Sequence, residues 1–85
     1  MRTPPERKGR FGKAIEELSH RAGLSRREMD VFRCLAMGYD ATATAKRLQV
    51  SWNTVRTHTR NVYAKLGVHS RQELIDLVDE ATKRT

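Results

Sequence analysis

The sequence of 85 residues has no long apolar run, a single cysteine and too few acidic residues to balance its basic ones. No apolar run approaches the roughly 18 to 20 residues that span a bilayer, so we expect neither a membrane segment nor a secretory signal. Cys34 has no partner for an internal disulfide, so we expect a cytoplasmic protein stabilised by packing alone. The length allows one domain, and a hydrophobic fraction of 38% argues against a disordered chain.

Acidic residues are missing altogether from one long stretch of the chain. Residues 41–72 contain six Lys or Arg side chains and no Asp or Glu, in a chain whose net charge is +7. Such a charge favours an anionic partner, either a nucleic acid or an acidic membrane surface. A membrane-surface helix is the weaker alternative, because no helical face is both basic and rich in bulky aromatic residues. The acid-free stretch therefore indicates a binding surface.

Apolar residues that recur at helical spacing predict an all-α fold. We predict a four-helix helix-turn-helix domain and one extra N-terminal helix, over residues 25–37, 41–49, 52–66, 70–82 and, for the extra helix, 11–22. The Ser25–Glu28 and Ser70–Glu73 pairs have the spacing of capping boxes, in which two side chains and two backbone amides bond reciprocally. Either Asp40 or Thr42 is expected to cap the short helix.

The first ten residues differ in composition from the rest of the chain. They hold both prolines, one glycine and four basic residues, and apart from Met1 and the prolines they offer no apolar side chain to anchor a helix. We therefore predict a flexible basic arm or linker over residues 1–10, followed by a single helix-turn-helix domain over residues 11–85.

The predicted helix over residues 52–66 has two faces of different character. One face is expected to pack on the domain and carries Val55, Thr59, Val62 and Leu66. The other is polar and cationic and carries Asn53, Arg56, Thr57 and Arg60. A short helix precedes it across a tight connection, which is the pattern of a helix-turn-helix whose second helix enters the DNA major groove. Arginine can donate two hydrogen bonds to guanine, and asparagine can form two with adenine.

Motifs along residues 24–74 resemble the LuxR/GerE-type (NarL/FixJ-type) DNA-binding domain of bacterial transcriptional regulators. The most specific motifs are LSxRE from Leu24, LAxG from Leu35, SxxTVRTH from Ser51 and KLGVxSRxEL from Lys65. The resemblance extends to about residue 81. It implies four helices, with the third in the major groove, and dimers that form on DNA through the last helix.

The resemblance also implies roles for particular residues. The base-contacting positions fall on Asn53, Arg56, Thr57 and Arg60. The positions for phosphate contacts fall on Thr42, Ser51, Thr54, Asn61, Lys65, Ser70 and Arg71. Leu77 and Ala81 are the candidate dimer contacts, because neighbouring apolar residues of the last helix can satisfy the core.

Four positions depart from the usual pattern of this family. Thr44 replaces a large aliphatic residue, and Ala43 replaces a glutamate. Thr59 replaces an aliphatic residue, and Arg26 replaces a proline. The two threonines bring hydroxyl groups to semi-buried sites, where they can bond back to the carbonyl four residues earlier at some cost to the helix. We therefore expect a lower stability than that of a typical member.

Other functions find less support in the sequence. It has no glycine-rich phosphate loop, nucleophile–base pair or carboxylate pair, so we do not expect an enzyme, and we expect no cofactor or small-molecule site. His20 and His69 have no partners at metal-ligand spacing, so no metal is expected. Two alternatives remain: a sigma-factor-like promoter-binding region, and a protein-interaction module that pairs with another regulator. RNA polymerase is a further candidate partner. The sequence fits both the output domain of a larger regulator with a sensory domain and a small stand-alone regulator.

Overall fold

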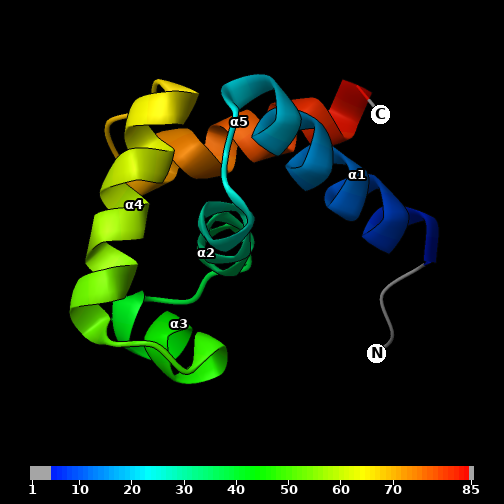
Figure 1. Cartoon of the computed structure of the whole chain (residues 1–85). Helices are drawn as coiled ribbons and strands as arrows, with labels where there is room; N and C mark the ends of the chain where they lie inside the picture. The colour runs from blue at the N-terminus through cyan, green and yellow to red at the C-terminus, as the bar shows by residue number, and fades with distance from the viewer. Residues whose placement is uncertain (1–4, 85) are drawn as a thin grey trace.

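Four helices surround a fifth, central helix in the computed structural model, which describes residues 5–84. The helices are α1 (Pro5–Ala22), α2 (Arg26–Ala36), α3 (Ala41–Leu48), α4 (Trp52–Leu66) and α5 (Arg71–Arg84). Helix α2 contacts each of the other four, and α1 lies along α5 (Figure 1). All regular structure within the described range is helical, so the predicted all-α fold is confirmed.

Side-chain caps define where α2 and α3 begin. Ser25 Oγ accepts the Glu28 N–H at 3.2 Å, and Glu28 Oε1 accepts the Ser25 N–H at 2.9 Å. The first predicted capping box is therefore confirmed. Helix α3 begins after Asp40, whose Oδ1 accepts the Ala43 N–H at 2.8 Å, so Asp40 and not Thr42 is its cap.

Caps also define the starts of α4 and α5. Ser51 Oγ accepts the Thr54 N–H at 3.0 Å at the start of α4. Ser70 Oγ accepts the Glu73 N–H at 3.1 Å, which is the first half of the second predicted box. The Glu73 carboxylate, however, accepts the N–H of His69 at 2.9 Å, one residue before the expected partner.

Helix α1 begins at Pro5, six residues before the start that we predicted. Two adjacent prolines suggested an unstructured segment, but proline is well tolerated in the first turn of a helix, where its missing N–H has no helical partner anyway. Residues 5–10, which we assigned to the arm, therefore belong to α1, and residues 1–4 lie outside the described residues. Within residues 5–84 no helix combines the length and apolar character needed to cross a membrane.

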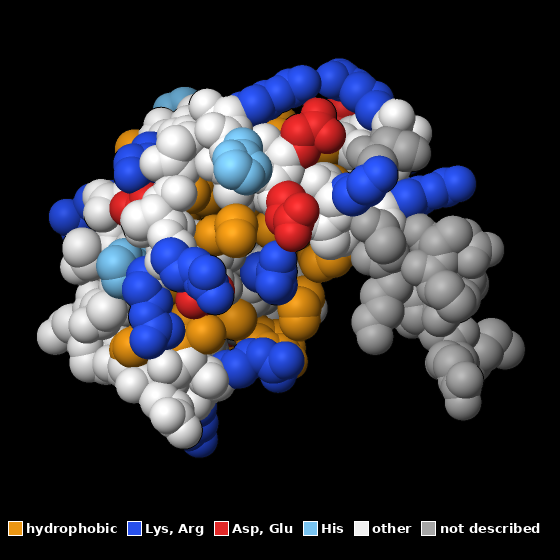
Figure 2. Space-filling model, turned by 45° about the vertical axis from the view of Figure 1, so that its right-hand side comes forward, with side chains coloured by type: hydrophobic (Ala, Val, Ile, Leu, Met, Phe, Trp, Pro, Cys, Tyr) orange, Lys and Arg blue, Asp and Glu red, His pale blue; other side chains and the backbone are white. Residues whose placement is uncertain are grey.

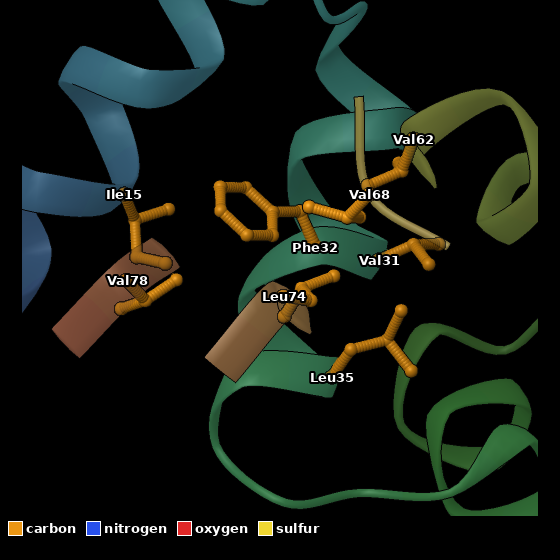
Figure 3. Close-up of a cluster of buried hydrophobic side chains, with 8 residues drawn as sticks. All are labelled: Ile15, Val31, Phe32, Leu35, Val62, Val68, Leu74 and Val78. Carbon is orange, nitrogen blue, oxygen red and sulfur yellow. The ribbon is translucent and has the colours of Figure 1, made fainter. Parts of the chain in front are cut away.

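Apolar side chains from four helices and one loop meet at the centre of the molecule (Figure 3). The buried cluster consists of Ile15, Val31, Phe32, Leu35, Val62, Val68, Leu74 and Val78. Phe32 of α2 extends its ring toward Ile15 of α1, which ties the extra N-terminal helix to the domain. Burying one side chain of this kind contributes about 1.5–3 kcal/mol relative to leaving it in water. Packing across helices therefore holds α4 in place.

Thr44 of α3 is one of three buried polar residues in the described range, together with Ser19 and Glu28. Its side chain is fully buried, and its Oγ1 has no hydrogen-bond partner. We expected a semi-buried residue whose hydroxyl could bond back to a carbonyl of its own helix. The residue is instead fully buried, and that bond is not present. An unpaired buried hydroxyl costs about 1–3 kcal/mol of stability. Thr59, the other threonine that departs from the family pattern, is half-buried as expected.

Candidate nucleic-acid interface

A tight connection joins α3 to α4 and directs α4 along one edge of the molecule (Figure 1). Gln49 ends α3 in the left-handed backbone conformation, with φ of 58°, so the chain turns sharply without a glycine. The Val50 N–H donates to the Ala45 carbonyl at 3.1 Å, and Ser51 then caps α4. Two helices joined by so short a turn form a helix-turn-helix.

The exposed face of α4 carries the predicted base-reading residues. Asn53, Arg56, Thr57 and Arg60 are all exposed. Val55 and Val62, on the opposite face, are fully buried. The predicted division of this helix into a packed face and a polar, cationic face is therefore present, whereas base contact itself stays a prediction. In Figure 2, blue Lys and Arg side chains outnumber red acidic ones on the face shown, in keeping with the net charge of +7.

Trp52 begins α4 and lies beside this face. Trp52 is 48% exposed, so about half of its surface remains accessible to a partner. The Arg56 guanidinium lies over the indole, with Cζ 5.0 Å from the ring centroid. This distance is that of a cation–π contact, which favours one orientation of the arginine.

The predicted phosphate-contacting residues fall into two groups, and the first group remains accessible. Thr42, in the first turn of α3, and Asn61 on α4 are exposed. Ser51 is also exposed, but its Oγ caps α4 and lies 2.8 Å from Thr54 Oγ1. These four hydroxyl and amide groups lie on or beside the two helices of the helix-turn-helix.

The second group already has partners inside the protein. Lys65 Nζ donates to Glu28 Oε1 at 2.7 Å and to the Gly23 carbonyl at 3.3 Å. The bond from Lys65, followed by that from the Ser25 backbone, lowers the pKa of the Glu28 carboxyl. The charge of Lys65 is therefore balanced within the protein, and the structure gives this residue a role that we did not predict.

Arg71 and Ser70, at the start of α5, are likewise structural. Arg71 Nη2 donates to the Tyr39 carbonyl at 2.6 Å and to the Leu35 carbonyl at 3.3 Å. Arg71 thus binds two carbonyls at the end of α2 and ties that end to α5. Ser70 is occupied as a cap, as described above. Neither role excludes a phosphate contact, because a guanidinium has five donors and a hydroxyl can also donate.

The two candidate dimer contacts lie next to α1. Leu77 and Ala81 are half-buried and line a groove together with Glu17, Leu18 and Arg21 of α1. The extra N-terminal helix therefore borders the face of α5 that the family resemblance assigned to dimer formation. A partner that docks on this face meets α1 as well as α5.

The remaining candidate groups are the histidines and the single cysteine. In the described part of the chain, no cluster of three or more His, Cys, Asp or Glu side chains could hold a metal ion. Cys34 is buried, and burial raises the pKa of its thiol. The Nδ1 atom of His58 is buried without a hydrogen-bond partner.

The sequence did not point to two contacts at this interface. The Trp52–Arg56 contact has a detectable signal, because residues four apart face each other on a helix. The Lys65–Glu28 pair joins residues 37 positions apart and has no local signal.

Comparison with known proteins finds regions similar to this chain in transcriptional regulators. The family model described as bacterial regulatory proteins, luxR family, matches residues 22–78. A Mycobacterium bovis protein and a Mycobacterium tuberculosis protein, both named as HTH-type transcriptional regulators, are each 49% identical over 61 residues. The HTH-type transcriptional regulator MalT of Yersinia pestis is 39% identical over 61 residues. Each match covers 72% of this chain and 7% of the relative. No solved structure matches the chain significantly.

Proposed function

We propose that this chain, which belongs to the luxR family of bacterial regulatory proteins, binds double-stranded DNA in a sequence-specific manner with α4 in the major groove. The observation that carries the proposal is the exposed face of α4, where Arg56 and Arg60 lie beside Asn53 and Thr57. The major groove is about 12 Å wide and admits one α-helix. Helix α4 lies along an edge of the molecule, so a duplex can approach this face (Figure 1).

Each side chain on this face has a chemistry suited to a base edge. Arg56 and Arg60 can each fork two N–H groups onto guanine O6 and N7. Asn53 can pair with adenine N6 and N7, and the Thr57 methyl group can contact the methyl group of thymine. Thr42, Ser51, Thr54 and Asn61 are placed to bind phosphates on either side. Lys65, Ser70 and Arg71 can add phosphate contacts while they keep their structural partners.

We further propose that two copies bind together on DNA through α5. Leu77 and Ala81 provide the apolar contact, and the neighbouring α1 side chains form its rim. A pair of copies places two α4 helices on one side of the duplex, about one helical turn apart. Leu77→Glu and Ala81→Glu should then reduce the bound mass from two copies to one per duplex in analytical ultracentrifugation, whereas Lys13→Ala on α1 should leave it at two.

The size of the relatives bears on the biological role. The chain matches 7% of the length of each of these regulators. We therefore propose that it acts as the DNA-binding output part of a larger regulator in the cytoplasm. Contact with RNA polymerase is one route by which it would control transcription. A fusion of this chain to a reporter domain should retain binding to its DNA site if the output function is separable.

Fluorescence anisotropy with a labelled duplex tests the DNA-binding proposal. The duplex is one that the wild-type protein has selected from a random pool, and the titration is repeated over a series of salt concentrations. Arg56→Ala and Arg60→Ala should each weaken binding by roughly 1–3 kcal/mol, the cost of one lost bidentate base contact. Lys13→Ala is the matched control, because it removes one exposed positive charge from α1.

The control decides how a loss of affinity is interpreted. If Arg60→Ala and Lys13→Ala weaken binding equally, total charge and not the α4 face determines affinity, and the proposal fails. If the wild-type protein binds no duplex at low salt, the alternative of a protein-interaction module takes its place.

A further inference from the structure

Trp52 is the only tryptophan in the chain and has a large exposed surface. It is 48% exposed, and the other large hydrophobic residue with comparable exposure in the described range is Met37, at 44%. Met37 ends α2, on a surface for which no partner is proposed. Trp52, by contrast, adjoins the face of α4 that we assign to DNA. Burying so large an aromatic ring requires a partner with an apolar surface of its own.

A groove runs along α4 beside Trp52. Arg56, Arg60 and Tyr63 of α4 line it with Trp52, and Arg71 of α5 also contributes to the lining. Trp52, Arg56 and Tyr63 are spaced four and seven residues apart, so they follow one side of the helix. Among the described residues that line this groove there is no Asp or Glu, and three guanidinium groups and two aromatic rings come together in it. Its chemistry therefore suits a ligand with both anionic and apolar parts.

The strand of a DNA duplex has that combination of groups. Its phosphates are anionic, and each deoxyribose between them presents C–H groups. We infer that Trp52 contacts the sugar–phosphate backbone of one strand at the edge of the major groove, and that it holds Arg56 in position for a base. This inference rests on the proposed function, because it requires α4 to lie in the major groove.

The cation–π contact gives Trp52 its positioning role. The Arg56 guanidinium lies 5.0 Å from the indole centroid. An arginine that is already oriented loses less side-chain freedom when it forms a bidentate contact, so affinity increases without a new hydrogen bond. Trp52 therefore acts both through its own contact and through Arg56.

The inference is testable by the fluorescence of the protein itself, since Trp52 is its only tryptophan. Saturating the protein with the selected duplex should change the emission of Trp52 and protect it from quenching by acrylamide. Inorganic phosphate at equal ionic strength is the control ligand, and it should give no protection. Unchanged quenching in a sample that anisotropy shows to be bound would overturn the inference and leave the proposed function intact. Equal protection by phosphate alone would replace the DNA backbone with a simple anion site and would also overturn it.

Substitutions then test the positioning role. Trp52→Ala should weaken binding of the selected duplex about fivefold, and Trp52→Phe should weaken it less, because a benzene ring still attracts the guanidinium. Met37→Ala, which removes the other exposed hydrophobic side chain, should bind as wild type does. In the Arg56→Ala background, Trp52→Ala should lose less affinity than in the wild type. Equal losses in both backgrounds would contradict the positioning role. If Arg60→Ala also fails to weaken binding, the proposed function itself is at fault.

Discussion

Replacing Glu28 with Gln should destabilise the protein by about 1–2 kcal/mol at neutral pH. The Glu28 side chain is 7% exposed, and its Oε1 accepts bonds from Lys65 Nζ at 2.7 Å and from the Ser25 N–H at 2.9 Å. A Gln side chain keeps an oxygen for the Ser25 N–H, so the variant preserves the capping box and removes the charge. The change therefore isolates the link between the start of α2 and the end of α4.

The expected magnitude follows from the different exposure of the two partners. A hydrogen bond to a charged group contributes about 1.5–3 kcal/mol, whereas an exposed ion pair contributes about 0.2–1 kcal/mol. Glu28 is nearly buried, but Lys65 is 40% exposed and regains water when the pair breaks. The loss of stability in Glu28→Gln should lie between these two ranges. A double-mutant cycle with Lys65→Met, which keeps the aliphatic stem, measures the coupling between the two side chains.

The pH dependence provides an independent check. The bonds from Lys65 and Ser25 lower the pKa of Glu28 below its ordinary value of 4.5. A carboxyl with a lowered pKa binds its proton more weakly in the folded state than in the unfolded state. Its contribution to the free energy of unfolding is therefore complete above the unfolded-state pKa and is lost as the pH falls through the folded-state pKa. Urea unfolding followed by circular dichroism should show the full difference between wild type and Glu28→Gln at about pH 7 and a smaller difference at about pH 2. An equal difference at both pH values, or zero coupling in the cycle, would refute this reasoning.

Three further predictions concern single side chains. Thr44→Val removes a buried, unpaired hydroxyl with little change of shape and should stabilise the protein by about 1 kcal/mol in urea unfolding; a loss of stability would show that the hydroxyl has a partner. Asp40→Ala removes the cap of α3 and should cost about 1 kcal/mol in the same assay, whereas Asp40→Asn should cost little. Burial raises the pKa of the Cys34 thiol, so iodoacetamide should modify it far more slowly in the folded protein than in urea, and equal rates would contradict its burial.

Local signals account for the part of the fold that the sequence predicted well. The Ser25–Glu28 capping box, the Ser51 cap and the left-handed Gly67 are each specified within a few residues, and the predicted bounds of α2 to α5 lie within two residues of those observed. Prolines were given too much weight at the N-terminus, where the first turn of a helix accommodates Pro5. The start of α1 was missed for that reason.

Contacts between distant residues account for what the sequence did not show. The exposed face of α4 was predictable from periodicity, because its residues belong to one helix. The partners of Lys65 and Arg71 lie 37 and 32 residues away along the chain, and no spacing rule links them. The packing of α1 beside Leu77 is likewise a tertiary fact. Cationic residues predicted for phosphate thus proved to have structural partners as well.

The central claim is that the exposed face of α4 reads DNA sequence. It is tested most directly by selecting binding sites from a random duplex pool, in parallel with the wild-type protein and with Arg60→Ala. The wild type should enrich one motif. The variant should enrich the same motif with the preference lost at one base pair, because a bidentate arginine contact specifies one guanine. Enrichment of no motif by the wild type, or of an identical motif by both proteins, would contradict the claim.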